Sequence, residues 1–114
     1  MRENGFSSRE TTEEIIGAGC EVWRVLGYGF LEKVYENTLV SEMRRRGLVV
    51  QQQVAIDVIY KGEAVGQYIA DLVVNNAVLV ELKAEKELNL AHQTQLLNYL
   101  KATNLPVGML MDFG

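Results

Sequence analysis

The sequence predicts an α+β domain in which helices flank a four-stranded mixed sheet, and three observations support that fold class. Apolar residues recur with helical spacing up to about residue 46 and then alternate with a period of two from residue 50. A further helical segment and a short apolar strand follow. The predicted order is therefore ααβββαβ, and the last crossover makes the fourth strand parallel to the third.

Two helices open this order. Thr11 and Glu14 have the spacing of a capping box, which predicts that the first helix begins at residue 11. Its apolar stripe consists of Ile15, Ile16, Val22, Trp23 and Leu26. The glycines of 27–29 interrupt the pattern, and a second helix is expected over about 30–46, with Gly47 as its C-terminal stop. Its expected buried residues are Leu31, Val34, Tyr35, Leu39 and Met43.

Three strands come next, over about 50–60, 65–74 and 77–83. A turn at 61–63 separates the first two. Asn75 and Asn76 suit a two-residue hairpin turn between the second and the third, because asparagine tolerates positive φ. The third strand is almost continuously apolar, which predicts a central position covered on both faces.

The last helix is expected over about 90–103, capped by Asn89 and followed by a strand over 107–113. Pro106 marks the break between them. The leucines expected to point inward are Leu96, Leu97 and Leu100.

Length and composition fit one small domain. The chain has 114 residues, of which 48% are hydrophobic, and this excludes a disordered or collagen-like chain. We expect a flexible start over residues 1–10 and a single domain over 11–114. No apolar run is long enough for a membrane span or a signal peptide, and the lone Cys20, expected to be a buried thiol, suits a reducing compartment. These features predict a cytoplasmic protein.

The charge balance argues against one class of function. Fifteen acidic residues against eleven basic ones give a net charge of -4, which disfavours a protein built mainly to coat nucleic acid. One bound divalent ion would bring that charge to about -2, so the objection is softened without being removed.

The most informative residues lie on the second and third strands. Glu81 and Lys83 are two residues apart, so both project from the same face, roughly 6–7 Å apart. A two-residue turn at Asn75 and Asn76 would place Asp71 opposite residue 80, but a shift of one residue decides whether the two carboxylates share a face. This point stays open at the level of the sequence.

Two interpretations of this group compete. Glu81 and Lys83 could be an exposed ion pair at a strand end, with Asp71 capping a turn. However, Glu81 follows an apolar run, where a charge is costly without a partner or an ion. Carboxylates that converge there suit Mg²⁺ or Mn²⁺, which would polarise a phosphoryl oxygen while Lys83 positions an attacking water.

Two further candidates lie on the helices. Glu32 is near the start of the second helix, where the helix dipole alone explains a carboxylate and where it could also complete a metal shell. On the last helix, His92, Gln95 and Tyr99 share a stripe. Gln95 could orient a water or a phosphate, or simply cap a loop. His92 is expected to be a surface histidine or one with a satisfied hydrogen bond, rather than a ligand.

Taken together, these segments resemble a known family. Gly29, Glu32 and Tyr35 match the motif of the small bacterial GxxExxY proteins, a branch of the PD-(D/E)XK nuclease superfamily. The superfamily signature is matched by Asp71 and then by Glu81-Leu-Lys83, with Gln95-x-x-x-Tyr99 on the next helix and residues 107–114 as the closing strand.

The resemblance implies a restriction-endonuclease-like αβββαβ core with an extra N-terminal helix. It further implies that Asp71, Glu81 and Glu32 surround a divalent metal, Mg²⁺ or Mn²⁺, with Lys83 beside the attacking water and Gln95 supporting the site. The expected reaction is metal-dependent hydrolysis of phosphodiester bonds in nucleic acid, with DNA as the expected substrate.

Two alternatives remain open beside the nuclease. The acidic balance and the small size suit a non-catalytic module that keeps the fold and binds nucleic acid or protein. The other is a structural homo-oligomer with no enzymatic role, for example a homodimer, that pairs through an exposed sheet edge.

Overall fold

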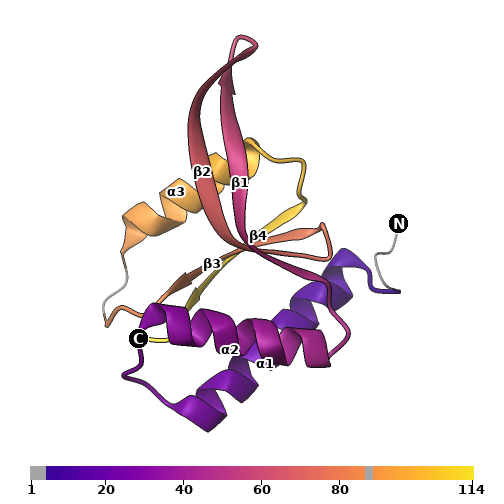
Figure 1. Cartoon of the computed structure of the whole chain (residues 1–114), viewed down its shortest axis with the longest axis vertical. Helices are drawn as coiled ribbons and strands as arrows, with labels where there is room; N and C mark the ends of the chain where they lie inside the picture. Colours follow the sequence, from indigo (N-terminus) through magenta and orange to yellow (C-terminus); the bar gives the residue numbers. More distant parts are fainter. Residues whose placement is uncertain (1–4, 87–88) are drawn as a thin grey trace.

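The computed structural model describes residues 5–86 and 89–114. Seven elements are observed: α1 (Ser8–Leu26), α2 (Glu32–Arg45), β1 (Val50–Tyr60), β2 (Glu63–Val74), β3 (Val78–Lys83), α3 (Leu90–Lys101) and β4 (Val107–Asp112). The strands form one sheet in the order β1-β2-β3-β4, antiparallel except for the parallel β3–β4 pair (Figure 1). The predicted fold class and element order are confirmed.

The start of α1 differs from the prediction. Its N-cap is Ser7, whose hydroxyl accepts from the Glu10 backbone N–H while the Glu10 carboxylate accepts from the Ser7 N–H, so the capping box lies one turn earlier than Thr11 and Glu14. Thr11 is fully buried, and its hydroxyl accepts from the Asn75 side-chain amide at 3.1 Å. The expected flexible start over 1–10 falls partly outside the described residues.

Two apolar cores cover the two faces of the sheet. The larger one packs α1 and α2 against side chains that include Leu72, Val80 and Leu82. The smaller one packs Leu96 of α3 against Leu79 and the β1–β2 hairpin. Figure 1 shows α1 and α2 together on one side of the sheet and α3 on the other. β3 is thus buried on both faces, as its apolar run predicts.

A few apolar side chains expected inside lie at the surface instead. Cys20, Ile16 and Trp23 of α1 are exposed, and they line one side of an open groove whose other side is β4. Leu31 and Val34, at the start of α2, are exposed as well. Leu97 is also exposed, since a single face of α3 covers the smaller core.

The turn between β2 and β3 has three residues, one more than expected. Val74 pairs with Val78, and both Asn75 and Asn76 adopt positive φ, 52° and 49°. The buried Asn75 side chain accepts from the Val49 backbone N–H at 2.8 Å. Because of the added residue, Leu72 lies opposite Val80, and the register places Asp71 opposite Glu81.

The sheet divides immediately beyond this pairing. β2 pairs with β3 only over Leu72–Val74, whereas it continues to pair with β1 up to the turn after Tyr60. The outer parts of β1 and β2, residues 54–69, form an arm whose base packs against α3 and whose tip extends beyond the rest of the molecule (Figure 1). The point where β2 leaves β3, at Asp71, is called the fork below.

The fork coincides with an irregularity in β1. Gln53 has a φ of +53°, and its side chain and that of the preceding Gln52 both reach Glu36 on α2. Neighbouring residues of a regular strand would point to opposite faces. The strand therefore turns over at Gln53, so that Val54 and Ile56 of the arm face α3.

Candidate active site

Asp71 and Glu81 lock together across the fork. The Asp71 backbone N–H donates to Glu81 Oε1 at 3.2 Å, and the Leu82 N–H donates to Asp71 Oδ2 at 2.8 Å. These two bonds stand where the next backbone pair of the β2–β3 ladder would otherwise form. The side chains consequently share one region of the sheet, which settles the question that the sequence left open.

Glu81 is held in an unfavourable environment for a charge. Its residue is only 8% exposed, and burial, together with the neighbouring Asp71 carboxylate, raises the pKa of Glu81 to about 7. A hydrogen bond from the Tyr68 hydroxyl partly opposes that rise. Two carboxylates packed in this way repel each other unless a proton or a cation lies between them.

Tyr68 links this pair to α3. Its ring stacks on the Tyr99 ring, with the centroids 3.7 Å apart and the planes nearly parallel. Burial and the bond to Glu81 raise the pKa of Tyr68 above its usual value, so it remains a hydrogen-bond donor. The arm and α3 thus clamp the tyrosine that orients Glu81.

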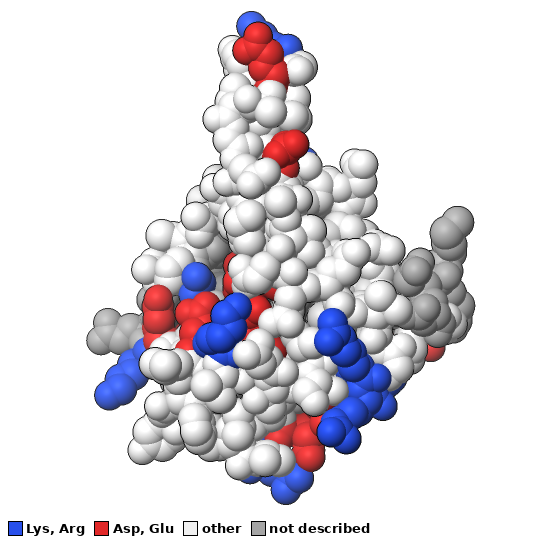
Figure 2. Space-filling view, viewed as in Figure 1, with Lys and Arg blue, Asp and Glu red and all other residues white. Residues whose placement is uncertain are grey.

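Glu32 and Lys83 are charged side chains near the Asp71–Glu81 pair. Glu32 is the first residue of α2, and partial burial raises its pKa while the Lys83 ammonium lowers it and the Asp71 carboxylate raises it. Glu32 is therefore within electrostatic range of both Lys83 and Asp71. Figure 2 shows acidic and basic side chains gathered below the arm, over the N-terminal end of α2.

The loop before α2 determines where Glu32 lies. Gly29 has a φ of +102°, a conformation that favours glycine. The buried Tyr35 hydroxyl donates to the Gly27 carbonyl at 2.6 Å and accepts from the Phe30 N–H at 3.3 Å. Its ring stacks on Phe113 at the end of β4, with 4.8 Å between the centroids. These contacts fix the entry to α2 and therefore the position of Glu32.

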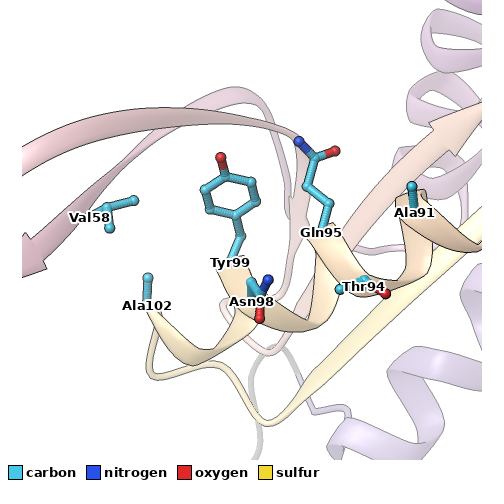
Figure 3. A pocket seen from close by; sticks show the side chains of 7 residues that line it. All are labelled: Val58, Ala91, Thr94, Gln95, Asn98, Tyr99 and Ala102. Atoms are coloured by element: carbon cyan, nitrogen blue, oxygen red, sulfur yellow. The ribbon is translucent and has the colours of Figure 1, made fainter.

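Gln95 lies on α3, one turn before Tyr99, in a groove of about 600 Å³ between that helix and the arm. Figure 3 shows the Gln95 and Tyr99 side chains pointing from α3 toward the strands. Gln95 is exposed and is not within the interlocked Asp71–Glu81 pair. His92, on the same helix, faces Glu85 with Nδ1 3.6 Å from Oε2.

The donor set is suited to a hard cation. Asp71 and Glu81 are adjacent and supply carboxylate oxygens, which Mg²⁺ and Mn²⁺ prefer, and a cation would relieve the repulsion that burial imposes on Glu81. Over residues 5–86 and 89–114, no three acidic, histidine or cysteine side chains are grouped closely enough to hold one ion together. Glu32 therefore faces the pair without joining it in one cluster.

Two parts of the site did not follow from the sequence. Tyr68 is three residues before Asp71 on β2, and the only available signal was its place in an alternating strand. Glu36 is buried and accepts from Lys33, Gln52 and Gln53, with the shortest distance 2.7 Å. Its spacing from Glu32 and the three consecutive glutamines of β1 could have suggested this network.

A comparison with protein families bears on the site. The family model described as the PD-(D/E)XK nuclease superfamily matches residues 9–114. Searches of curated proteins and of solved structures returned no significant match. In the described part of the chain, no helix is both long and apolar enough to cross a bilayer.

Proposed function

Since the chain belongs to the PD-(D/E)XK nuclease superfamily, we propose that it is a metal-dependent nuclease that hydrolyses phosphodiester bonds in DNA. The observation that carries the proposal is the interlocked pair of Asp71 and Glu81 at the fork. A purely structural strand end would not need to bury a carboxylate against a second one, because each buried charge costs free energy.

The four charged side chains have separate roles in this proposal. Asp71 and Glu81 hold a divalent cation, Mg²⁺ or Mn²⁺, and Glu32 contributes to its shell from α2 through a water ligand. When bound, the cation polarises a phosphoryl oxygen and lowers the pKa of a water ligand. Lys83 positions the attacking water and offsets negative charge that develops on the phosphate. Tyr68 fixes the orientation of Glu81.

Gln95 is assigned a supporting role. It projects from α3 into the groove beside Tyr99, where an amide can donate to a phosphate oxygen or orient a water. The groove leads along the arm, so a nucleic-acid strand placed there would pass between α3 and β1.

We also assign the chain to the GxxExxY branch. The three motif residues support this assignment through one physical role. Gly29 and Tyr35 shape the loop that presents Glu32 to the fork. A motif that positions one site carboxylate is expected to accompany the signature on β2 and β3.

The test is a cleavage assay on duplex, single-stranded and branched DNA and on RNA, with Mg²⁺ or Mn²⁺ compared with EDTA. Asp71→Asn, Glu81→Gln and Lys83→Met should each reduce cleavage by at least ~10³-fold, because each removes a charge that acts on the reacting phosphate. Glu63→Gln removes a carboxylate from the tip of β2, far from the fork, and is the matched control.

Each variant should be compared with the wild type by circular dichroism and thermal unfolding, so that a loss of fold is recognised. Cleavage that persists in Asp71→Asn and Lys83→Met would overturn the proposal. DNA binding without cleavage under any metal condition would support the non-catalytic module instead.

A further inference from the structure

A second polar surface lies at the opposite end of α2 from the carboxylates. A shallow groove runs between the C-terminal half of this helix and β1, and it is lined by Asn37, Val40, Ser41, Arg44, Arg45 and Gln52. Asn37, Ser41, Arg44 and Arg45 follow one stripe of the helix at i, i+4, i+7 and i+8. Basic side chains gather at this end of α2 in Figure 2, apart from the acidic side chains at the other end.

The two arginines of this groove differ from the other arginines that the structure describes. Those three are engaged by acidic partners: Arg9 by Glu13, Arg24 by Glu21 and Arg46 by Glu42 and Glu14. Within the described ranges, Arg44 and Arg45 have no acidic side chain within ion-pair distance. Both are exposed and therefore accessible to a ligand. In a chain with a net charge of -4, two uncompensated arginines in one groove are notable.

Arg44 is also held in place. Its Nη2 donates to the Val50 carbonyl at 3.0 Å, which fixes the guanidinium at the entrance to β1 and leaves its other N–H groups available. A guanidinium presents donors in a fixed fork that matches phosphate oxygens. The hydroxyl of Ser41 and the amide of Asn37 add neutral donors along the same stripe.

Hydrogen bonds of Gln52 link the groove to Glu36, one turn after Glu32 on α2. The Gln52 amide donates both to Glu36 Oε2 at 2.7 Å, on the side of the carboxylate site, and to Asn37 Oδ1 at 2.9 Å, on the side of the groove. Glu32 and Arg44 are twelve residues apart on one helix, so about 18 Å of helix axis separates them. That length corresponds to about five base pairs of a duplex.

We propose that the α2–β1 groove binds the phosphate backbone of the nucleic acid whose cleavage is assigned to the fork. Arg44 and Arg45 contact phosphates about one half-turn of duplex away from the carboxylates, and Gln52 couples the position of the groove to that of Glu36. This inference rests on the proposed nuclease function. It also explains how an acidic chain can engage a polyanion, because the basic contacts are concentrated in one groove.

A binding assay tests the groove independently of the cleavage reaction. The affinity of the full chain for a fluorescein-labelled 20-base-pair DNA duplex, and for one of its strands, is measured by fluorescence anisotropy in EDTA, where the proposed cleavage does not occur. R45E should weaken binding at least ~10-fold. The double variant R44A/R45A should lower the slope of log K against log salt by nearly two, since each phosphate contact contributes about 0.9.

R24E is the matched control, because it reverses an exposed arginine that Glu21 already engages on α1. Its affinity for the duplex should fall much less than that of R45E. Since Arg44 also bonds to the backbone of β1, R44K is included to retain the charge, and thermal unfolding checks that each variant folds.

The outcomes distinguish the two proposals. If R45E binds as tightly as the wild type, with an unchanged salt slope, the groove is not a nucleic-acid site. These arginines would then be assigned to a protein partner, and the nuclease assignment would be unaffected. Weakened binding by R45E in a chain that never cleaves would support the groove and contradict the nuclease. A raised KM with little change in kcat for R45E is expected if both hold.

Discussion

The two halves of β2 present a sharp contrast. The end of its C-terminal half, Leu72–Val74, is buried between β1 and β3 and packs on the helices, whereas its N-terminal half extends into the arm, where Val65 is 59% exposed. One strand thus passes from the centre of the domain to its periphery over a few residues. Asp71 is at the point of change, and the candidate site lies there.

This contrast explains how two carboxylates come together without closing the sheet. Where β2 and β3 are paired, backbone groups bond to backbone groups and apolar side chains fill both faces. Where β2 leaves with the arm, the Asp71 and Leu82 N–H groups would lose their partners, and the two carboxylates accept from them. The division of the sheet therefore separates β2 from β3 at the fork, and it leaves N–H groups there that acidic side chains can accept from.

The largest difference between the two halves should appear in stability. Leu72→Ala removes a side chain with no exposed surface from the larger core and should lower the free energy of unfolding by about 3 kcal/mol. Val65→Ala, on the arm, should change it by less than about 0.5 kcal/mol. Urea unfolding monitored by circular dichroism measures both, and equal losses would contradict the division of β2 into a buried and an exposed half.

The contribution of the fork to the free energy of unfolding should depend on pH. Because the pKa of Glu81 is about 7 in the folded protein and 4.5 is its ordinary value, the folded state binds more protons between these limits. The contribution of Glu81 to metal-free stability is then largest below pH 4.5 and is lost as the pH rises through 7. Glu81→Gln should avoid that loss.

The measurement is the free energy of unfolding of Glu81→Gln minus that of the wild type, followed from pH 4 to pH 8 in EDTA. This difference should grow by roughly 2–3 kcal/mol in favour of the variant. Adding Mg²⁺ at pH 8 should stabilise the wild type more than the variant, since a ligand that binds the folded state raises its stability. A difference that does not vary with pH would rule out the buried charge as its cause.

The fold could be predicted because it follows from local patterns. The change of period at residue 50, the cap at Asn89 and the charged Glu81 after an apolar run are all visible in the sequence. The structure has the predicted elements within a few residues. The site roles assigned to all five candidates stay predictions: Asp71, Glu81, Glu32, Lys83 and Gln95.

What could not be predicted depended on tertiary contacts. Ser7 with Glu10 and Thr11 with Glu14 are two capping boxes in tandem, and the burial of Thr11 against Asn75 selects the first of them. The same Asn75 takes up a backbone bond of Val49, which favours a three-residue turn over a two-residue one. That single residue of register decides that Asp71 faces Glu81.

The smallest effects are expected in the arm, where backbone conformation is the main determinant. Gly62, at its tip, has a φ of +85° with open space around it, so Gly62→Ala should cost about 1 kcal/mol through the backbone alone. Gly66→Ala, four residues further along β2, also meets no neighbour, but its φ is not positive, and alanine there should be neutral or stabilising by about 0.5 kcal/mol. Urea unfolding of the two variants measures the difference. If both substitutions changed the free energy of unfolding in the same direction, backbone conformation would not be the main determinant of stability in the arm.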